Sequence, residues 1–160
     1  MTLRTAAIRR LWRYLRLNPQ QRRDVRCALL LIPVVVVGLH IAGYAQVLSA
    51  LDRTSLRRRP STSTAPVDDA RAVAAMVSTA SRLGVVPSKC LDRSLVTWWI
   101  LRRRGIPAVV RLGASSDPAQ LMTFHAWVEC EGEVVNDRSD VLARFVPFPA
   151  EAFTPARWSN

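Results

Sequence analysis

The sequence predicts an α+β fold in which a helix carrying a cysteine packs on an antiparallel sheet carrying a histidine and an aspartate. Residues 88–104 have the apolar periodicity of a helix. They are followed by short apolar runs typical of strands, at 108–112 and within 122–137. Residues 27–51 contain no Asp, Glu, Lys or Arg, which adds a helical, hydrophobic N-terminal segment to the fold.

Charge divides the chain into two unequal parts. Residues 1–59 contain twelve Arg and two acidic residues, whereas residues 60–160 are nearly neutral, so the net charge of +11 belongs to the N-terminal third. The Pro, Ser and Thr residues of 60–66 are typical of a linker. The sequence therefore predicts a basic, hydrophobic helical region at 1–59, a linker at 60–66 and a globular domain at 67–160.

The basic N-terminal region allows several interpretations. Residues 3–16 place apolar side chains on one helical face and arginines around the rest, as in an ordinary surface helix or one that binds a membrane or a partner. The run 27–51 is long enough to span a bilayer, but arginines flank both of its ends, which disfavours a single crossing. We expect a buried or membrane-peripheral helical pair, broken near Pro33 or Gly38. Nucleic acid is not an expected partner, because no recognition motif accompanies the charge.

Two helices open the C-terminal domain. Asp68 or Asp69 can cap the first helix, and Gly84 can end it. Ser88 can cap the second helix, and Gly105 can end it. The apolar stripes of both helices predict core packing.

Cys90 falls in the first turn of the second helix. Exposed backbone N–H groups and the positive end of the helix dipole stabilise a negative charge on its sulfur there, and Lys89 adds to this. A single cysteine in a helix more often serves packing than catalysis. With Cys27 and Cys130, the spacing is neither that of a disulfide framework nor that of a CxxC metal site. Such a sparse, odd count predicts a cytoplasmic protein, with membrane association through residues 1–59 left open.

The stretch MTFHAWVECEGEVVND, residues 122–137, predicts a β-hairpin. A three-residue loop at 130–132 would put Gly132 in the left-handed conformation that such loops favour. In that register His125 faces Asp137, with Cβ atoms about 4.5–5.5 Å apart. The pair is either a satisfied histidine on a sheet or the base and the orienting carboxylate of a catalytic site.

The blocks around these residues resemble one known family. The segments CLDRSLVTWWILRRRGIPAVVRLG, FHAWVECEGEVVND and FVPFP occur in the order and spacing of the protein-B family of lasso-peptide biosynthesis. These are stand-alone leader peptidases with a transglutaminase-like fold, and the resemblance covers roughly residues 68–150. It implies a transglutaminase/papain-like cysteine peptidase domain at 67–160. It also implies a catalytic triad of Cys90 as nucleophile, His125 as general base and acid, and Asp137 as the orienter of His125.

The resemblance also implies an activity and its partners. The expected reaction is removal of the leader peptide from a ribosomally made precursor, together with a small leader-binding protein and an asparagine-synthetase-like macrolactam cyclase. The chain contains no Walker-type phosphate-binding loop, so any ATP use would belong to a partner, and no cofactor is expected. The alternatives are an acyl transferase acting on a peptide substrate, or a catalytically idle membrane-associated scaffold.

Three details of the site stay open at this point. Asp140 would take the orienting role if the hairpin register differs. The backbone N–H of Cys90 is the first candidate donor to an oxyanion, and Ser88 is the one side-chain donor just upstream. A zinc ion held by Cys90, Cys130 and His125 is disfavoured, because their spacing is not typical of metal ligands.

Overall fold

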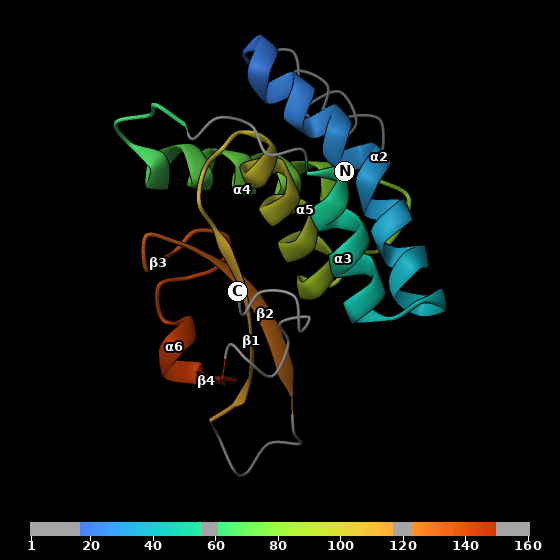
Figure 1. The fold of residues 1–160 in the computed structure, drawn as a ribbon, viewed down its shortest axis with the longest axis vertical. Helices are drawn as coiled ribbons and strands as arrows, with labels where there is room; N and C mark the ends of the chain where they lie inside the picture. The colour runs from blue at the N-terminus through green and yellow to red at the C-terminus, as the bar shows by residue number, and fades with distance from the viewer. Residues whose placement is uncertain (1–16, 56–60, 117–122, 150–160) are drawn as a thin grey trace, which may run out of the picture.

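A computed structural model of the chain describes residues 17–55, 61–116 and 123–149. Figure 1 shows the long helices gathered on one side of the molecule, with the sheet and a short helix on the other. In chain order, the elements are α2 (Pro19–Ile41), α3 (Tyr44–Thr54), α4 (Pro66–Leu83), α5 (Cys90–Arg103), β1 (Val109–Ser115), β2 (Phe124–Cys130), β3 (Glu133–Val134), α6 (Val141–Arg144) and β4 (Phe145–Pro147). The α+β fold class expected from the sequence is confirmed.

The apolar N-terminal run forms the expected pair of helices, but with a different break. α2 is capped by the side chain of Asn18 and continues through Pro33 and Gly38. The chain reverses at Gly43, whose φ of 80° is the left-handed conformation that glycine adopts without strain. Gly38 instead serves packing, because Val47 of α3 lies 3.0 Å from where its Cβ would be. The break expected near Pro33 or Gly38 is therefore wrong.

The ends of α4 and α5 follow the sequence signals only in part. α4 begins at Pro66, so Asp68 and Asp69 lie in its first turn rather than at its cap. Gly84 ends α4 as expected. Gly105 follows α5 with φ 72°, which is the left-handed conformation typical of the residue after a helix.

α2 packs against α4 and α5 within a single apolar cluster. The chain enters α4 through residues 61–65, where the backbone N–H of Ser61 donates to the carbonyl of Gly105 at 2.9 Å. Fully buried members of the cluster are Val25 and Val35 from α2, Val73 and Val77 from α4, Leu95 and Leu101 from α5, and Val128 from β2. The domain boundaries at 60–66 stay a prediction, and this cluster has members on both sides of them.

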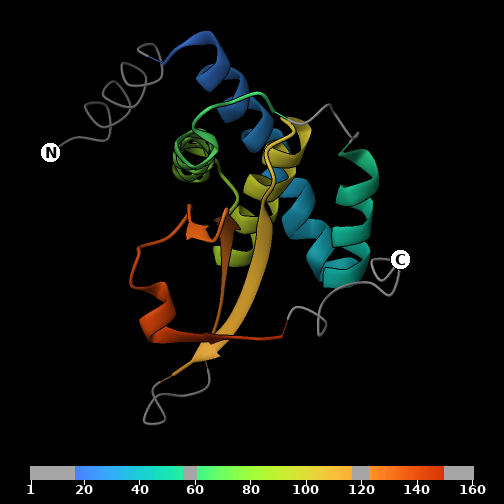
Figure 2. The same ribbon diagram turned by 60° about the vertical axis from the view of Figure 1, so that its left-hand side comes forward.

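The strands form an antiparallel sheet in the order β3-β2-β1-β4. Figure 2 shows β1 and β2 as the long central strands, with α6 and β4 at their lower end. Val128 and Cys130 of β2 belong to the apolar cluster, and Val110 of β1 packs against it. Since side chains alternate along a strand, His125, Trp127 and Glu129 lie on the opposite face of β2.

β2 and β3 are joined by a two-residue turn rather than the expected three-residue loop. Glu131 has φ 51° and Gly132 has φ 80°, and two successive positive φ values are what a type I′ turn requires. Cys130 therefore pairs with Glu133 and belongs to the strand instead of the loop. The hairpin register expected from the sequence is wrong by one residue.

Gly113 of β1 has no room for a side chain. A Cβ there would lie 2.6 Å from the carbonyl oxygen of Val146 and 2.9 Å from the indole of Trp127. Gly113→Ala is expected to destabilise the fold by about 1–3 kcal/mol, as overpacking of a core does. It should also change the near-ultraviolet circular dichroism of the displaced indole.

Gly132→Ala is the matched control for this prediction. No atom lies within 4 Å of the Cβ position at Gly132, so only the positive φ resists the substitution there. Thermal unfolding followed by circular dichroism gives both stabilities. Unchanged stability and an unchanged aromatic spectrum for Gly113→Ala would contradict the close contact with Trp127.

Candidate active site

Cys90 is the first residue of α5, in agreement with its expected place in the first turn. The N-cap is Lys89, and the carboxylate of Asp92 accepts from the Lys89 backbone N–H at 2.6 Å, which fixes that turn. Ser88, the expected cap, is instead hydrogen-bonded to Ser81 of α4 through the two hydroxyl oxygens, 2.6 Å apart. The expectation that Ser88 caps α5 is therefore wrong.

α5 runs alongside β2 in the same direction. The hydroxyl of Ser94 donates to the carbonyl of Ala126, near the start of β2, at 3.0 Å. One turn later, the indole N–H of Trp98 donates to the carbonyl of Ala108 at 3.1 Å. Ala108 directly precedes β1 at the end that pairs with the last residues of β2. The N-terminal end of α5 therefore points to the first residues of β2.

This direction brings Cys90 to the same end of the molecule as His125. Cys90 precedes Ser94 by one helical turn, about 5.4 Å, on the same helix face. His125 precedes Ala126 by one residue, about 3.3 Å along the strand. The thiol is half-buried. Among the described residues, no contact joins Cys90 to His125; the packing of α5 on β2 places the two residues at the same end of these elements.

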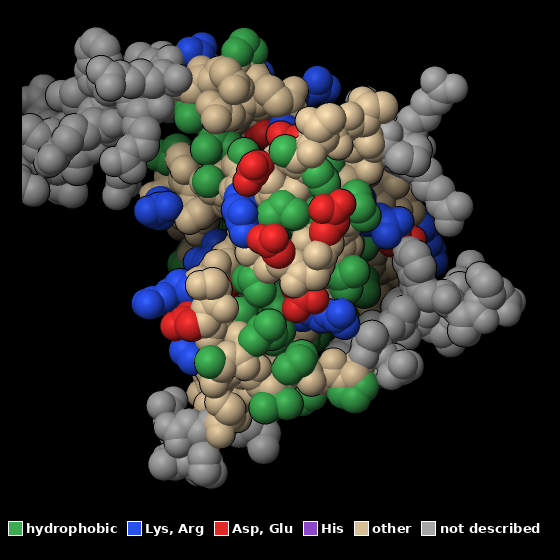
Figure 3. Space-filling model, turned by 90° about the vertical axis from the view of Figure 1, so that its left-hand side faces the viewer, with side chains coloured by type: hydrophobic (Ala, Val, Ile, Leu, Met, Phe, Trp, Pro, Cys, Tyr) green, Lys and Arg blue, Asp and Glu red, His purple; other side chains and the backbone are tan. Residues whose placement is uncertain are grey.

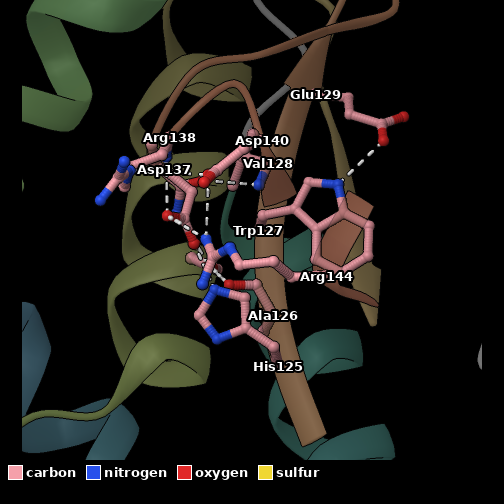
Figure 4. Close-up of polar contacts among 11 residues, drawn as sticks. His125, Ala126, Trp127, Val128, Glu129, Asp137, Arg138, Asp140 and Arg144 are labelled. Atoms are coloured by element: carbon pink, nitrogen blue, oxygen red, sulfur yellow. Dashed lines mark hydrogen bonds and ion pairs between the residues drawn. The ribbon is translucent and has the colours of Figure 1, made fainter. Parts of the chain in front are cut away.

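His125 and Asp137 are joined by a direct hydrogen bond between Nε2 and Oδ2. Figure 4 shows the imidazole turned toward this carboxylate. Each side chain is 20% exposed, so the pair is largely removed from water. If β3 continued in the observed register, Asp137 would pair with Ala126. Its side chain would then lie on the face of the sheet opposite to His125. The chain leaves the sheet before that point, and the bend after β3 carries Asp137 back to His125.

The second oxygen of Asp137 is also occupied. The backbone N–H of Arg138 donates to Oδ1 at 2.7 Å, and the guanidinium of Arg144 lies 3.7 Å from the same atom. Arg144 also lies 3.3 Å from the carboxylate of Asp140. Asp140, the alternative orienter, is therefore paired with Arg144, and the carboxylate that bonds His125 belongs to Asp137.

Aromatic side chains fix the plane of the imidazole. The ring of His125 stacks on Phe145 of β4, with centroids 4.7 Å apart, and on Trp127, with centroids 6.3 Å apart. The indole N–H of Trp127 donates to Glu129 at 2.9 Å, and Arg111 of β1 bonds the other oxygen of that carboxylate. With Nε2 bonded to Asp137, the second ring nitrogen has no hydrogen-bond partner in the part of the chain that the structure describes. Nδ1 is therefore the ring nitrogen left for a further partner.

A short polar network joins α5 to β2 where β3 ends. The side chain of Asn136 accepts from the backbone N–H of Val128 at 2.6 Å and donates to the hydroxyl of Ser94 at 2.9 Å. Ser94 in turn donates to the carbonyl of Ala126. The backbone N–H and C=O groups of Ala126 and Val128 point toward the β3 side of β2. β3 is too short to pair with this part of β2. The backbone N–H of Val135 donates to the carbonyl of Val128. Side chains satisfy the N–H of Val128 and the carbonyl of Ala126, and they tie α5 to the strand of His125.

The comparison with known families gives the fold a name. A family model described as the transglutaminase-like superfamily matches residues 34–150. The chain belongs to this superfamily. The chain itself matches none of the curated proteins and none of the solved structures. The transglutaminase-like fold expected from the sequence is thus confirmed, and the superfamily indicates cysteine protease or acyltransferase activity.

The other cysteines of this transglutaminase-like chain lie outside the site. Cys130 is five residues from His125 along β2, about 17 Å away, so these two cannot share a zinc ion. Burial raises the pKa of the Cys130 thiol, as do the charges of Glu131 and Glu133, and burial likewise raises the pKa of Cys27. No group of three or more His, Cys, Asp or Glu side chains in the described residues is placed to hold a metal ion.

Electrostatics keep Asp137 ionised. Burial by itself raises the pKa of its carboxyl. The hydrogen bonds from His125 and from the Arg138 backbone, with the charges of His125 and Arg144, outweigh that effect and hold the pKa below its ordinary value. An ionised Asp137 is the state that accepts a hydrogen bond from His125.

Asp137→Asn is expected to change how stability depends on pH. A carboxyl whose pKa is lower in the folded state stabilises the fold above its unfolded pKa of about 3.9, and this contribution is lost as the pH falls through the folded-state pKa. The difference between wild type and variant in the free energy of unfolding should therefore be largest near neutral pH and shrink below about pH 4. Urea unfolding from pH 7 down to acidic pH measures it. Asp140→Asn, which leaves the His125 bond in place, is the matched control, and a pH-independent difference for Asp137→Asn would contradict this assignment.

Two residues of the site were missed from the sequence, Ser94 and Asn136. Ser94 lies one turn after Cys90 in the block that resembles the lasso-peptide family, and Asn136 directly precedes Asp137. The sequence signal for Ser94 was its position four residues after Cys90, which puts both side chains on one face of the helix. Nothing local pointed to Asn136, whose partners lie on other elements.

Proposed function

We propose that this transglutaminase-like protein is a cysteine peptidase that removes the leader peptide from a lasso-peptide precursor. The observation that carries the proposal is the bonded His125–Asp137 pair at the start of β2, the end toward which the helix carrying Cys90 points. The superfamily supports cysteine chemistry on an acyl group. The likeness of the Cys, His and Asp blocks to the protein-B family makes the leader–core junction of a precursor peptide the expected substrate.

The proposed reaction forms and then hydrolyses a thioester. His125 takes the proton of the Cys90 thiol, and the sulfur attacks the carbonyl carbon at the leader–core junction. The C–N bond breaks, His125 protonates the leaving amine, and the core peptide departs. Water that gives its proton to His125 then attacks the thioester and releases the leader as a carboxylate, which regenerates the thiol. Asp137 holds the Nε2–H tautomer and stabilises the imidazolium.

The oxyanion of each tetrahedral intermediate needs preorganised donors. The backbone N–H of Cys90 belongs to the first turn of α5, where N–H groups have no intrahelical acceptor. The hydroxyl of Ser88 is bonded to Ser81, so that side chain is already engaged. The backbone of the first turn is therefore the proposed source of the oxyanion donors.

Recognition of a long precursor is proposed to depend on partners. The site comes from a few residues of a small domain, which leaves little surface to read a leader peptide. A small leader-binding protein would hold the leader and raise the effective concentration of the scissile bond near Cys90. An asparagine-synthetase-like cyclase would then close the released core. We place this assembly in the cytoplasm.

An acyl transferase is the second candidate, and the superfamily match favours it. The same thioester attacked by an amine instead of water gives transamidation. The two reactions differ in product mass, because hydrolysis adds one water while transamidation of a side-chain amide loses ammonia.

Mass spectrometry of lasso precursor peptides, incubated with the purified chain and a leader-binding protein, tests the proposal. The expected result is a free leader and a core that together weigh one water more than the precursor. Masses that show loss of ammonia and a new cross-link would support the transferase instead. An intact precursor, with the partner shown to hold the leader, would overturn the peptidase and favour the idle scaffold.

A further inference from the structure

α2 exposes a line of large apolar side chains. Leu30, Val34, Val37 and Ile41 are exposed by 75%, 63%, 53% and 82%. Their spacing of four, three and four residues places them on one side of the helix. We call these four residues the α2 stripe. It extends over about 17 Å of helix length.

The opposite side of α2 is covered by the protein itself. Val25, Ala28, Ile32 and Val35 are buried against α4 and α5. α2 is the one helix of the described residues that is long and apolar enough to cross a membrane. A helix that is apolar on every side requires apolar surroundings on every side, and the protein supplies only half of them. Since α2 is packed on two other helices, lipid can cover the stripe from outside but cannot surround the helix.

Positive charge continues the line of the stripe. Arg23 and Arg26 are exposed and precede Leu30 at the same helical spacing, so they extend the α2 stripe toward the N-terminus. Residues 1–59 as a whole carry a surplus of ten positive charges. Asp68 of α4 and Glu133 of β3 are exposed. Figure 3 shows a face on which acidic and basic side chains are mixed. An anionic surface therefore complements Arg23 and Arg26 at the N-terminal end of the stripe.

We infer that the α2 stripe lies on an anionic lipid membrane, with the helix in the plane of the interface. The four apolar side chains enter the boundary between headgroups and acyl chains, as interfacial helices do. Arg23 and Arg26 extend to the lipid phosphates, because a long aliphatic stem lets the guanidinium reach the headgroups. This holds the protein at a membrane surface and goes beyond the proposed function, on which it does not depend.

Vesicle flotation with the full chain tests the inference. The chain is expected to float with phosphatidylcholine vesicles that contain about a third phosphatidylglycerol, and much less with phosphatidylcholine alone or at high salt. The triple variant Leu30→Gln, Val34→Gln, Val37→Gln should lower the partition coefficient at least about tenfold. The double variant Arg23→Gln, Arg26→Gln should lower binding to anionic vesicles by about 25-fold at low salt, at about a fivefold loss per arginine.

Matched controls separate the stripe from general hydrophobicity and from misfolding. Val85→Gln and Val109→Gln replace exposed valines outside α2 and should float like the wild type. The stripe variants should keep the wild-type circular dichroism, since the replaced side chains are exposed.

Two results would overturn the inference. A triple variant that floats like the wild type would assign membrane binding to other basic residues. A wild type that binds no vesicles but sediments as a dimer, with a monomeric triple variant, would assign the α2 stripe to a second copy of the chain.

Discussion

Cys90→Ala is expected to abolish cleavage of the leader peptide, with a fall in rate of at least about 10⁴-fold. The substitution removes the only atom proposed to form the acyl intermediate, while His125 and Asp137 keep their hydrogen bond. Cys90 is half-buried at the start of a helix, so the methyl group of alanine fits and the fold should persist. A mass-spectrometric time course with precursor and leader-binding protein measures the rate.

Cys27→Ala and Cys130→Ala are the matched controls for this loss. Both remove a thiol whose pKa is raised by burial, and both lie outside the site. Variants at these positions should cleave at the wild-type rate once folded. Cys90→Ala should also still bind the precursor–partner complex, because binding does not need the sulfur. Full cleavage by Cys90→Ala would show that Cys90 is not the nucleophile and would contradict the proposed cysteine peptidase.

The position of Cys90 could be predicted because its signals are local. A polar start, an apolar face over four turns and a terminal Gly105 define α5 without help from the rest of the chain. The cap was placed one residue early, at Ser88, because the hydroxyl that suits a cap is engaged by Ser81 of α4. Contacts with another element therefore decided what the local sequence left ambiguous.

The contact between His125 and Asp137 was predicted through a register that is wrong. In the sequence, Gly132 is the one residue of the turn expected to be left-handed, and one such residue suggests a three-residue loop. In the structure Glu131 also has positive φ, which is uncommon for a residue other than glycine. The two-residue turn shifts the pairing by one. The contact forms because the chain bends out of the strand at Asn136, which the hairpin pattern does not reveal.

The break between α2 and α3 shows the same limit. Pro33, Gly38 and Gly43 all weaken a helix locally, so the sequence offers three candidate breaks. Packing selects among them, because the close approach of Val47 requires a residue without a side chain at Gly38, inside the helix. Gly43 is left to reverse the chain.

Asn136→Ala is expected to destabilise the fold by about 1–3 kcal/mol, because it leaves the backbone N–H of Val128 and the hydroxyl of Ser94 without their partner. Asn136→Asp keeps the acceptor for Val128 but cannot donate to Ser94, so it separates the two contacts. Ser94→Ala removes the second contact from the helix side, together with the bond from Ser94 to the carbonyl of Ala126. Urea unfolding of the single and double variants gives the coupling between the two residues, which should be clearly above zero.

The same variants distinguish a stabilising network from a positioning one. Asn136 holds the bend that delivers Asp137 to His125, and it also fixes Ser94, one turn from Cys90. Its loss should therefore lower kcat for leader cleavage well below the fraction of folded protein, with little change in KM, because the leader is proposed to be held by a partner protein. A kcat that follows the folded fraction alone would limit the network to stability. If Asn136→Asp has the wild-type kcat, the acceptor at Val128 positions the site. If Asn136→Asp lowers kcat as much as Asn136→Ala does, the link from Asn136 to Ser94 of α5 positions it.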